Sequence, residues 1–294
     1  MSLFKILSPI LVSVVLLLSC KTTYQPTNST QTRSEDTYLL ADSILQVGLD
    51  NEALYTLLGD LKPVSSLVSF SVPISTLSDS AAGFPNAQSD TAIFCCHLAK
   101  TSRIQHAINT IDIDGLDVLL VPYATPYNDT RSIQVSVVRT ITLDSLLQAQ
   151  RPFFSQFGLV PGAHPAVVIT ANEYGNKYDR LRGYGYLFGY PDHAVDFFVQ
   201  AARESDRSGQ HVKRDFFRIP TFESTEGNFV YAIPKGQQIT PVDSLIRSRA
   251  AWLLKEYRRW RPHYLRSDST LRAQELIRDF LETHQARKIR QIEM

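Results

Sequence analysis

The chain has 294 residues; 44% of them are hydrophobic, 20% are charged, and the formal net charge is +1. A chain of this length can bury a large hydrophobic core without disulfide or metal cross-links. The near-neutral charge produces no strong overall field, so the composition argues against nucleic acid as a partner.

The N-terminus has the composition of a secretory signal peptide over residues 1–19. Lys5 supplies a positive charge, and residues 6–18 form an apolar run that two serines and a proline interrupt. This run is shorter than the roughly 20 apolar residues that a membrane span needs, and it fits the apolar part of a signal peptide. It ends in Leu17-Leu18-Ser19-Cys20.

These last four residues resemble the lipobox of bacterial lipoproteins, in which an aliphatic residue and two small or tolerated residues precede a cysteine. Leu18 is the least usual of the four. The resemblance implies cleavage before Cys20 and attachment of fatty acyl groups such as palmitate there, which makes the membrane a partner through this lipid. The alternatives are a plain signal peptide with an incidental cysteine, or an uncleaved anchor.

The residue after the cysteine bears on the location. Lys21 stands where retention at the inner membrane would call for aspartate, so the resemblance implies the periplasmic face of the outer membrane. Residues 20–33 are polar and rich in Thr, Ser, Asn and Gln, and they are predicted to form a flexible tether. Residues 34–294 are predicted to form a single domain, with a possible C-terminal helical subregion at 240–294.

Helical and strand periodicities alternate along the rest of the chain. Helices are predicted at 34–48, 53–58, 91–111, 143–157, from 192 after Gly189-Tyr190-Pro191, at 242–259 and at 270–290; strands are predicted at 65–72, 116–121, 132–140, 212–219 and 228–233. Residues 166–170 are ambiguous. Hairpin-like strand pairs with helices clustered at both ends favour an α+β fold with a mixed or antiparallel sheet.

The stretch 183–203 is the most distinctive in the sequence. Its first half, with three glycines, is predicted to be a turn that leads into a core helix. The predicted core face of this helix consists of Ala194, Val195, Phe198, Ala201 and Ala202. The spacing of the glycines differs from that of dinucleotide-binding loops.

Candidate catalytic and binding residues surround this helix start. Glu173, Asp192 and His193 would form an acid–base set if folding brought them together, and their alternative roles are helix capping and solvated loop positions. The N-terminus of the helix attracts anions. Tyr184, Tyr186 and Tyr190 lie just upstream and could wall a ligand pocket.

The cysteines that follow Cys20 do not indicate a metal site or a disulfide. Cys95 and Cys96 are adjacent, so their side chains diverge on a helix and cannot converge on one metal ion without distortion. We expect them to be small buried residues of a core helix. The acidic run at 112–117 does not match the spacing of a calcium loop. No metal and no cofactor is therefore predicted.

The C-terminal segment has a basic excess. Residues 247–294 contain twelve Lys and Arg against six Asp and Glu, with aromatic residues interleaved among Arg258, Arg259 and Arg261. Such a segment can contact anionic headgroups or envelope polymers, and its alternative role is a solvated helix face. The leading hypothesis is thus a lipid-anchored envelope protein that binds a ligand, a polymer or a protein partner. The alternative is an envelope hydrolase that uses Glu173, Asp192 and His193.

Overall fold

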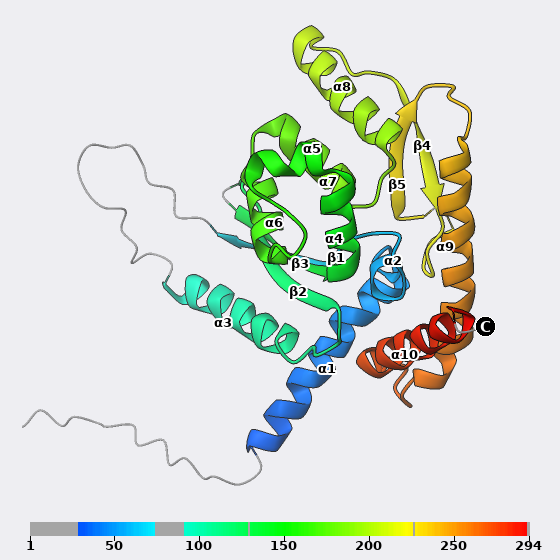
Figure 1. The fold of residues 1–294 in the computed structure, drawn as a ribbon. Helices are drawn as coiled ribbons and strands as arrows, with labels where there is room; N and C mark the ends of the chain where they lie inside the picture. Colours follow the sequence, from blue (N-terminus) through cyan, green and yellow to red (C-terminus); the bar gives the residue numbers. More distant parts are fainter. Residues whose placement is uncertain (1–28, 74–90, 129, 226, 293–294) are drawn as a thin grey trace, which may run out of the picture.

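A computed structural model describes residues 29–73, 91–128, 130–225 and 227–292. The lipobox ending Leu17-Leu18-Ser19-Cys20 and residues 20–28 of the expected tether lie outside the described residues. The fold is α+β with antiparallel sheets, as the sequence predicts (Figure 1).

The central sheet has three strands in the order β1-β3-β2. Strand β3 (Thr130–Arg139) pairs antiparallel with β1 (Val64–Pro73) on one edge and with β2 (Leu116–Pro122) on the other. The register against β1 shifts between Ser66 and Ser69. The β-branched segment 65–72, the continuous apolar run 116–121 and the alternating segment 132–140 predict these three strands, and all three are confirmed.

A separate hairpin forms the second sheet. Strand β4 (Arg214–Ile219) pairs antiparallel with β5 (Phe229–Pro234), which confirms the predicted strand pair. Side chains alternate along β4, so Phe217 and Ile219 are buried whereas Phe216 and Arg218 are exposed.

Helices lie before, between and after the strands. Their bounds are α1 Ser29–Asp50, α2 Leu54–Leu57, α3 Thr91–Ile108, α4 Thr140–Ala149, α5 Arg151–Phe154, α6 Pro165–Glu173, α7 Lys177–Leu187, α8 Asp192–Ser208, α9 Pro241–Trp260 and α10 Ala273–Ile292, with short 3-10 turns η1 Ser155–Phe157 and η2 Arg261–Tyr264. Figure 1 shows α4 to α7 gathered beside the three-stranded sheet, and the β4–β5 hairpin between α8 and α9. None of the helices in the described part of the chain combines the length and apolarity that crossing a membrane requires.

Strand β3 separates two hydrophobic clusters. Val137 faces a cluster that also holds side chains of α1, α2, the hairpin, α9 and α10. Its neighbour Val138 faces the other cluster, which α4 to α8 supply. Both valines are fully buried because successive side chains of a strand point to opposite faces. Tyr190, between α7 and α8, packs against both clusters.

Several boundaries differ from the sequence predictions. Helix α1 begins at Ser29, so residues 29–33 of the expected tether are helical; no proline or glycine interrupts the sequence between Ser29 and the predicted start. The predicted helix at 143–157 is broken after Ala149, because Pro152 lacks an N–H and cannot continue the preceding helix.

The predicted glycine-rich turn is mostly helix. Gly183 and Gly185 lie inside α7 and are buried, and only Gly189 occupies a turn. A Cβ on Gly183 would meet Oδ1 of Asn172 at 1.7 Å, and one on Gly185 would meet Val195 at 2.8 Å. These two glycines therefore permit close packing of α7 against α6 and α8, which local sequence rules do not reveal.

Two burial predictions are wrong. Phe198 is 37% exposed, and the Arg214 guanidinium lies over its ring at 5.7 Å. Val199 takes the inward position, together with Ala194, Val195 and Ala201. Cys95 and Cys96 are both exposed rather than buried. The apolar pattern of a helix predicts which side chains share a face, but it does not show whether another element covers each of them.

Candidate functional site

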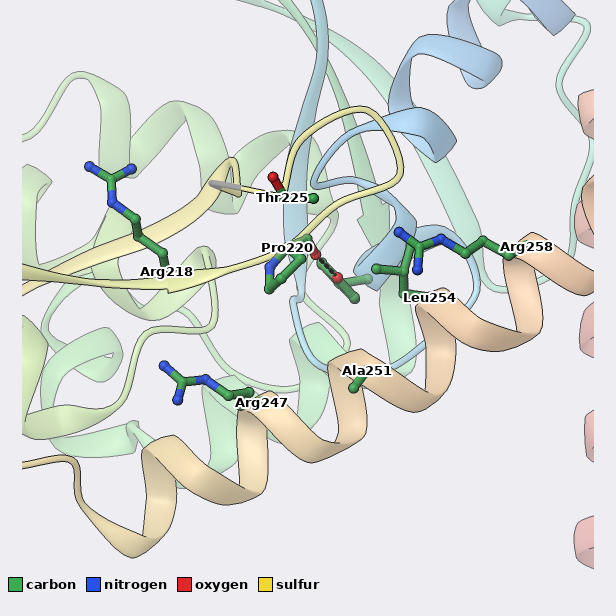
Figure 2. Close-up of a pocket in the computed structure, with 8 residues that line it drawn as sticks. Arg218, Pro220, Thr225, Arg247, Ala251, Leu254 and Arg258 are labelled. Carbon is green, nitrogen blue, oxygen red and sulfur yellow. Dashed lines mark hydrogen bonds between the residues drawn. The ribbon is translucent and has the colours of Figure 1, made fainter.

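A hollow of about 590 Å³ opens between α9 and the β4–β5 hairpin (Figure 2). Its lining comes from α2, β4, the loop after β4, and α9. The lining residues are Tyr55, Arg218, Pro220, Thr225, Arg247, Ala251, Leu254 and Arg258. This volume is in the range of sites that hold a small-molecule ligand.

Helix α9 forms one wall of the hollow. Arg247, Ala251, Leu254 and Arg258 follow one another at intervals of four, three and four residues, which places them on one helix face. A capping box between Thr240 and Asp243 fixes where the helix starts, and so sets this row against the hairpin.

The opposite wall depends on a buried tyrosine. Tyr55 of α2 packs on Phe229 with ring centroids 5.6 Å apart, and its hydroxyl donates a hydrogen bond to the Pro220 carbonyl. This bond ties the loop after β4 to α2, and Figure 2 draws it at the centre of the hollow. Burial raises the pKa of Tyr55, and the positive charge of Arg258 acts in the opposite direction. Tyr55 therefore stays protonated and keeps its donor.

Three arginines line the hollow. Arg218 and Arg247 lie toward the N-terminal end of α9 and Arg258 toward its C-terminal end, as Figure 2 shows. The Arg247 guanidinium lies over the ring of buried Phe217 at 4.2 Å from its centroid. Such stacking fixes the plane of the guanidinium and leaves its edge N–H groups available to an acceptor.

These three arginines have no acidic partner among the described residues, whereas their neighbours on α9 and beyond do. Arg249 pairs with Asp60, Arg259 with Glu256, and Arg261 with Asp50. Part of the basic excess is thus neutralised within the fold, and Arg218, Arg247 and Arg258 are cations without an acidic partner that line the hollow. Guanidinium groups bind carboxylates and phosphates through paired hydrogen bonds, so the hollow can hold an anion.

Glu173 lies in a different place from His193. Its carboxylate is buried and accepts hydrogen bonds from the Ala124 amide at 2.7 Å and from the Tyr184 hydroxyl at 2.6 Å. Arg180 Nη1 is 4.0 Å from the same carboxylate. Burial and the bond to Glu173 raise the pKa of Tyr184. This arrangement fastens the loop after β2 to α6 and α7.

Asp192 and His193 have separate partners despite their adjacency. Asp192 is exposed and accepts a hydrogen bond from Gln150 at 2.8 Å. His193 Nε2 is 3.3 Å from Oδ1 of buried Asp243, although the two atoms are not aligned for a hydrogen bond. Among the described contacts none joins Glu173, Asp192 and His193 to one another.

The three candidate tyrosines also lie apart from the hollow. Tyr184 contacts Glu173 as described above, and Tyr186 is buried with its ring 5.7 Å from that of Phe153. Tyr190 stacks on Phe229 at 6.1 Å. Their rings face neighbouring side chains of the two hydrophobic clusters.

A buried lysine is a further feature that the sequence does not reveal. Lys62 is fully buried, with Nζ 2.5 Å from Glu52 Oε2 and 4.7 Å from the centroid of the Phe229 ring. Burial lowers the pKa of Lys62, and the Glu52 carboxylate opposes this shift. The pair lies beside Gly189, whose turn contacts the Leu61 carbonyl.

The sequence contains a partial signal for the arginine-lined hollow. The spacing of Arg247, Ala251, Leu254 and Arg258 marks an amphipathic row with a cation at each end. Arg218 and Tyr55 could not be added to it, because only folding brings β4 and α2 beside α9.

No group of three or more His, Cys, Asp or Glu side chains is arranged to hold a metal ion within the described ranges. The chain matches no protein-family model, and neither a curated protein nor a solved structure is significantly similar to it.

Proposed function

We propose that this protein is a lipid-anchored protein of the bacterial cell envelope whose α+β domain binds an anionic ligand in the arginine-lined hollow. The observation that carries the binding role is that Arg218, Arg247 and Arg258, without acidic partners among the described residues, line one hollow. Guanidinium groups without an acidic partner keep N–H donors that a bound anion would accept hydrogen bonds from.

The anchor is supported by the sequence at the N-terminus. The apolar run, its length and the ending Leu17-Leu18-Ser19-Cys20 agree with a lipoprotein signal. With lipid on Cys20, residues that follow it would carry the hollow close to the membrane surface, where anionic envelope polymers or protein partners occur. The periplasmic face of the outer membrane is the location that we propose.

The hydrolase alternative receives less support. It needs Glu173, Asp192 and His193 within reach of one another, and the described contacts give each of them a different partner. The binding role needs only exposed cations around a hollow, and that arrangement is present.

Calorimetric titration with tripolyphosphate and citrate at low ionic strength tests the binding role. We expect the wild-type protein to bind at least one of these anions, and Arg247→Gln with Arg258→Gln to weaken that binding by about tenfold or more, because each charged hydrogen bond contributes about 1.5–3 kcal/mol. Lys213→Gln with Lys255→Gln is the matched control, since it also removes two positive charges, both from exposed residues outside the lining of the hollow. Equal loss in the control would mean that only the overall charge matters.

The anchor has its own test. Cys20→Ser should abolish metabolic labelling by palmitate and release the protein from membranes, because it removes the thiol that would receive the lipid. A variant that stays with the membrane after a carbonate wash would show that the apolar segment is itself the anchor.

A further inference from the structure

We infer that the hollow recognises an elongated ligand with an anionic group at each end and an uncharged, apolar middle. The inference rests on the proposed function, since it specifies the shape of the anion that the arginines bind. It follows from three observations on the hollow: where the cations lie, what separates them, and how much space they enclose.

The cations are separated along the helix. Arg247 and Arg258 are eleven residues apart on α9, so the helical rise places their Cα atoms about 16 Å apart along the axis. Helical side chains lean toward the N-terminus of their helix, and Figure 2 shows both guanidinium groups displaced in that direction. The displacement is shared, so the separation of the two charges is roughly that of their backbones. One compact anion cannot contact both.

The surface between the cations is apolar. Ala251 and Leu254 lie between the two arginines on the same helix face, and Pro220 lies opposite them. Of the two side-chain hydroxyls in the lining, that of Tyr55 is already bonded to the Pro220 carbonyl, and that of Thr225 belongs to the loop after β4. A polar or charged middle segment would find few partners here, whereas a hydrocarbon segment would cover apolar surface and gain the hydrophobic contribution.

The volume of the hollow fits one small-molecule ligand rather than the extended surface of a membrane or polymer. A hollow of about 590 Å³ accommodates a ligand of the usual small-molecule size and also the length between Arg247 and Arg258. Arg218 adds positive charge at the same end as Arg247, although its guanidinium points away from α9 and lies over the ring of Phe216 at 5.8 Å. The two ends are therefore unequal, with more positive charge near the N-terminus of α9.

Linear dicarboxylates of increasing chain length test the inference. They carry the same two charges at every length, and only the hydrocarbon between the charges changes. We expect the affinity of the wild-type protein to pass through a maximum at one intermediate length, with a dicarboxylate of that length binding about tenfold tighter than the monocarboxylate of equal length. Shorter chains reach only one end.

Two single variants test whether Arg247 and Arg258 each bind one end of the ligand. Arg247→Gln and Arg258→Gln should each reduce the affinity of the best dicarboxylate to about that of the matching monocarboxylate, and Lys255→Gln should leave the maximum unchanged. For malonate, which cannot span the hollow, at most one of the two arginine variants should have a large effect. A hydrocarbon chain of the same length with one phosphate group at each end tests whether phosphates can replace the carboxylates.

The outcomes separate this inference from the proposed function. Anion binding that depends on Arg247 and Arg258 but shows no preferred chain length would overturn the inference and leave the anion site standing. Tighter binding of polyuronate than of any dicarboxylate, again without a length maximum, would point to a polymer instead. If no anion binds to the wild-type protein, both proposals fail.

Discussion

Asp243 joins three elements through one buried carboxylate. It accepts hydrogen bonds from the Tyr231 hydroxyl on β5 and from the backbone amide and hydroxyl of Thr240 at the start of α9. Nε2 of His193, on α8, lies 3.3 Å from Oδ1 of Asp243. Burial alone would raise the pKa of Asp243, but these hydrogen bonds and the nearby His193 outweigh it and hold the pKa below its ordinary value.

This arrangement makes Asp243 a residue for stability. Asp243→Asn should lower the free energy of unfolding at pH 7 by about 2–4 kcal/mol, because it weakens a helix cap and hydrogen bonds to a charged acceptor. The folded pKa is depressed, so the contribution is complete above the unfolded value of about 4 and is lost as the pH falls through the folded value. The difference in the free energy of unfolding between wild type and variant should therefore shrink in acid. Urea unfolding at pH 7 and at an acidic pH below the folded pKa of Asp243 would show this.

Asp192 is the matched control for that measurement. It begins the neighbouring helix α8 but is exposed, with Gln150 as its hydrogen-bond partner. Asp192→Asn should cost no more than about 1 kcal/mol, the usual contribution of a charge near a helix N-terminus. Equal losses for the two variants would show that the buried network around Asp243 does not hold α8, β5 and α9 together.

At the scale of elements, the turn between α7 and α8 depends on one glycine. Gly189 has φ +74°, in the left-handed region, and a Cβ there would lie 2.3 Å from the Leu61 carbonyl oxygen. Gly209, which ends α8, has φ +69°, and a Cβ there would meet no atom within 4 Å. The two positions share the backbone conformation and differ in the space around them.

Alanine substitutions at Gly209 and Gly189 separate the cost of the left-handed backbone from the cost of the clash with Leu61. Gly209→Ala should cost about 1–2 kcal/mol, the usual penalty for a left-handed non-glycine residue. Gly189→Ala should cost about 1–3 kcal/mol more, because the methyl group forces the turn away from the backbone at Leu61 and Lys62. Thermal and urea unfolding measure both. Similar losses at the two positions would mean that the contact with Leu61 yields easily.

Across the whole molecule, buried tyrosines determine the response to alkali. Burial, in several cases with a neighbouring carboxylate, raises the pKa of Tyr55, Tyr184, Tyr190, Tyr231 and Tyr257. In the unfolded chain a tyrosine titrates near pH 10. Above that pH the unfolded state binds fewer protons than the folded state, so the stability present at lower pH is lost as the pH rises.

The free energy of unfolding should therefore fall steeply above about pH 10. Ultraviolet absorbance of phenolate and far-ultraviolet circular dichroism, followed together, should show the buried tyrosines ionising as the fold is lost. The urea-unfolded protein, whose tyrosines are all solvated, provides the reference titration. Full ionisation without loss of the circular dichroism signal would mean that these hydroxyls are open to water.

The amino-acid sequence by itself predicts the strands and most of the long helices of the described residues, because these patterns depend on residues close in the chain, but it does not predict α6 and α7. A β-branched segment predicts β1, a continuous apolar run predicts β2, alternation predicts β3, and helical spacing predicts α9 and α10. Local rules fail where a distant element decides the outcome. Gly183 lies inside a helix and leaves the space that Asn172 of α6 occupies, and Phe198 is 37% exposed with the Arg214 guanidinium over its ring.

The tertiary structure alone decides which side chains share a site. Glu173 and His193, twenty residues apart, acquire different partners, whereas Arg218 of β4 and Arg258 of α9 come to line one hollow. The pairing of charges also depends on the fold: Arg261 and Arg258 are close in the sequence, yet Asp50 pairs with Arg261, whereas Arg258 lines the hollow without an acidic partner among the described residues. Such pairing depends on contacts between residues far apart in the chain, which spacing along one sequence does not encode.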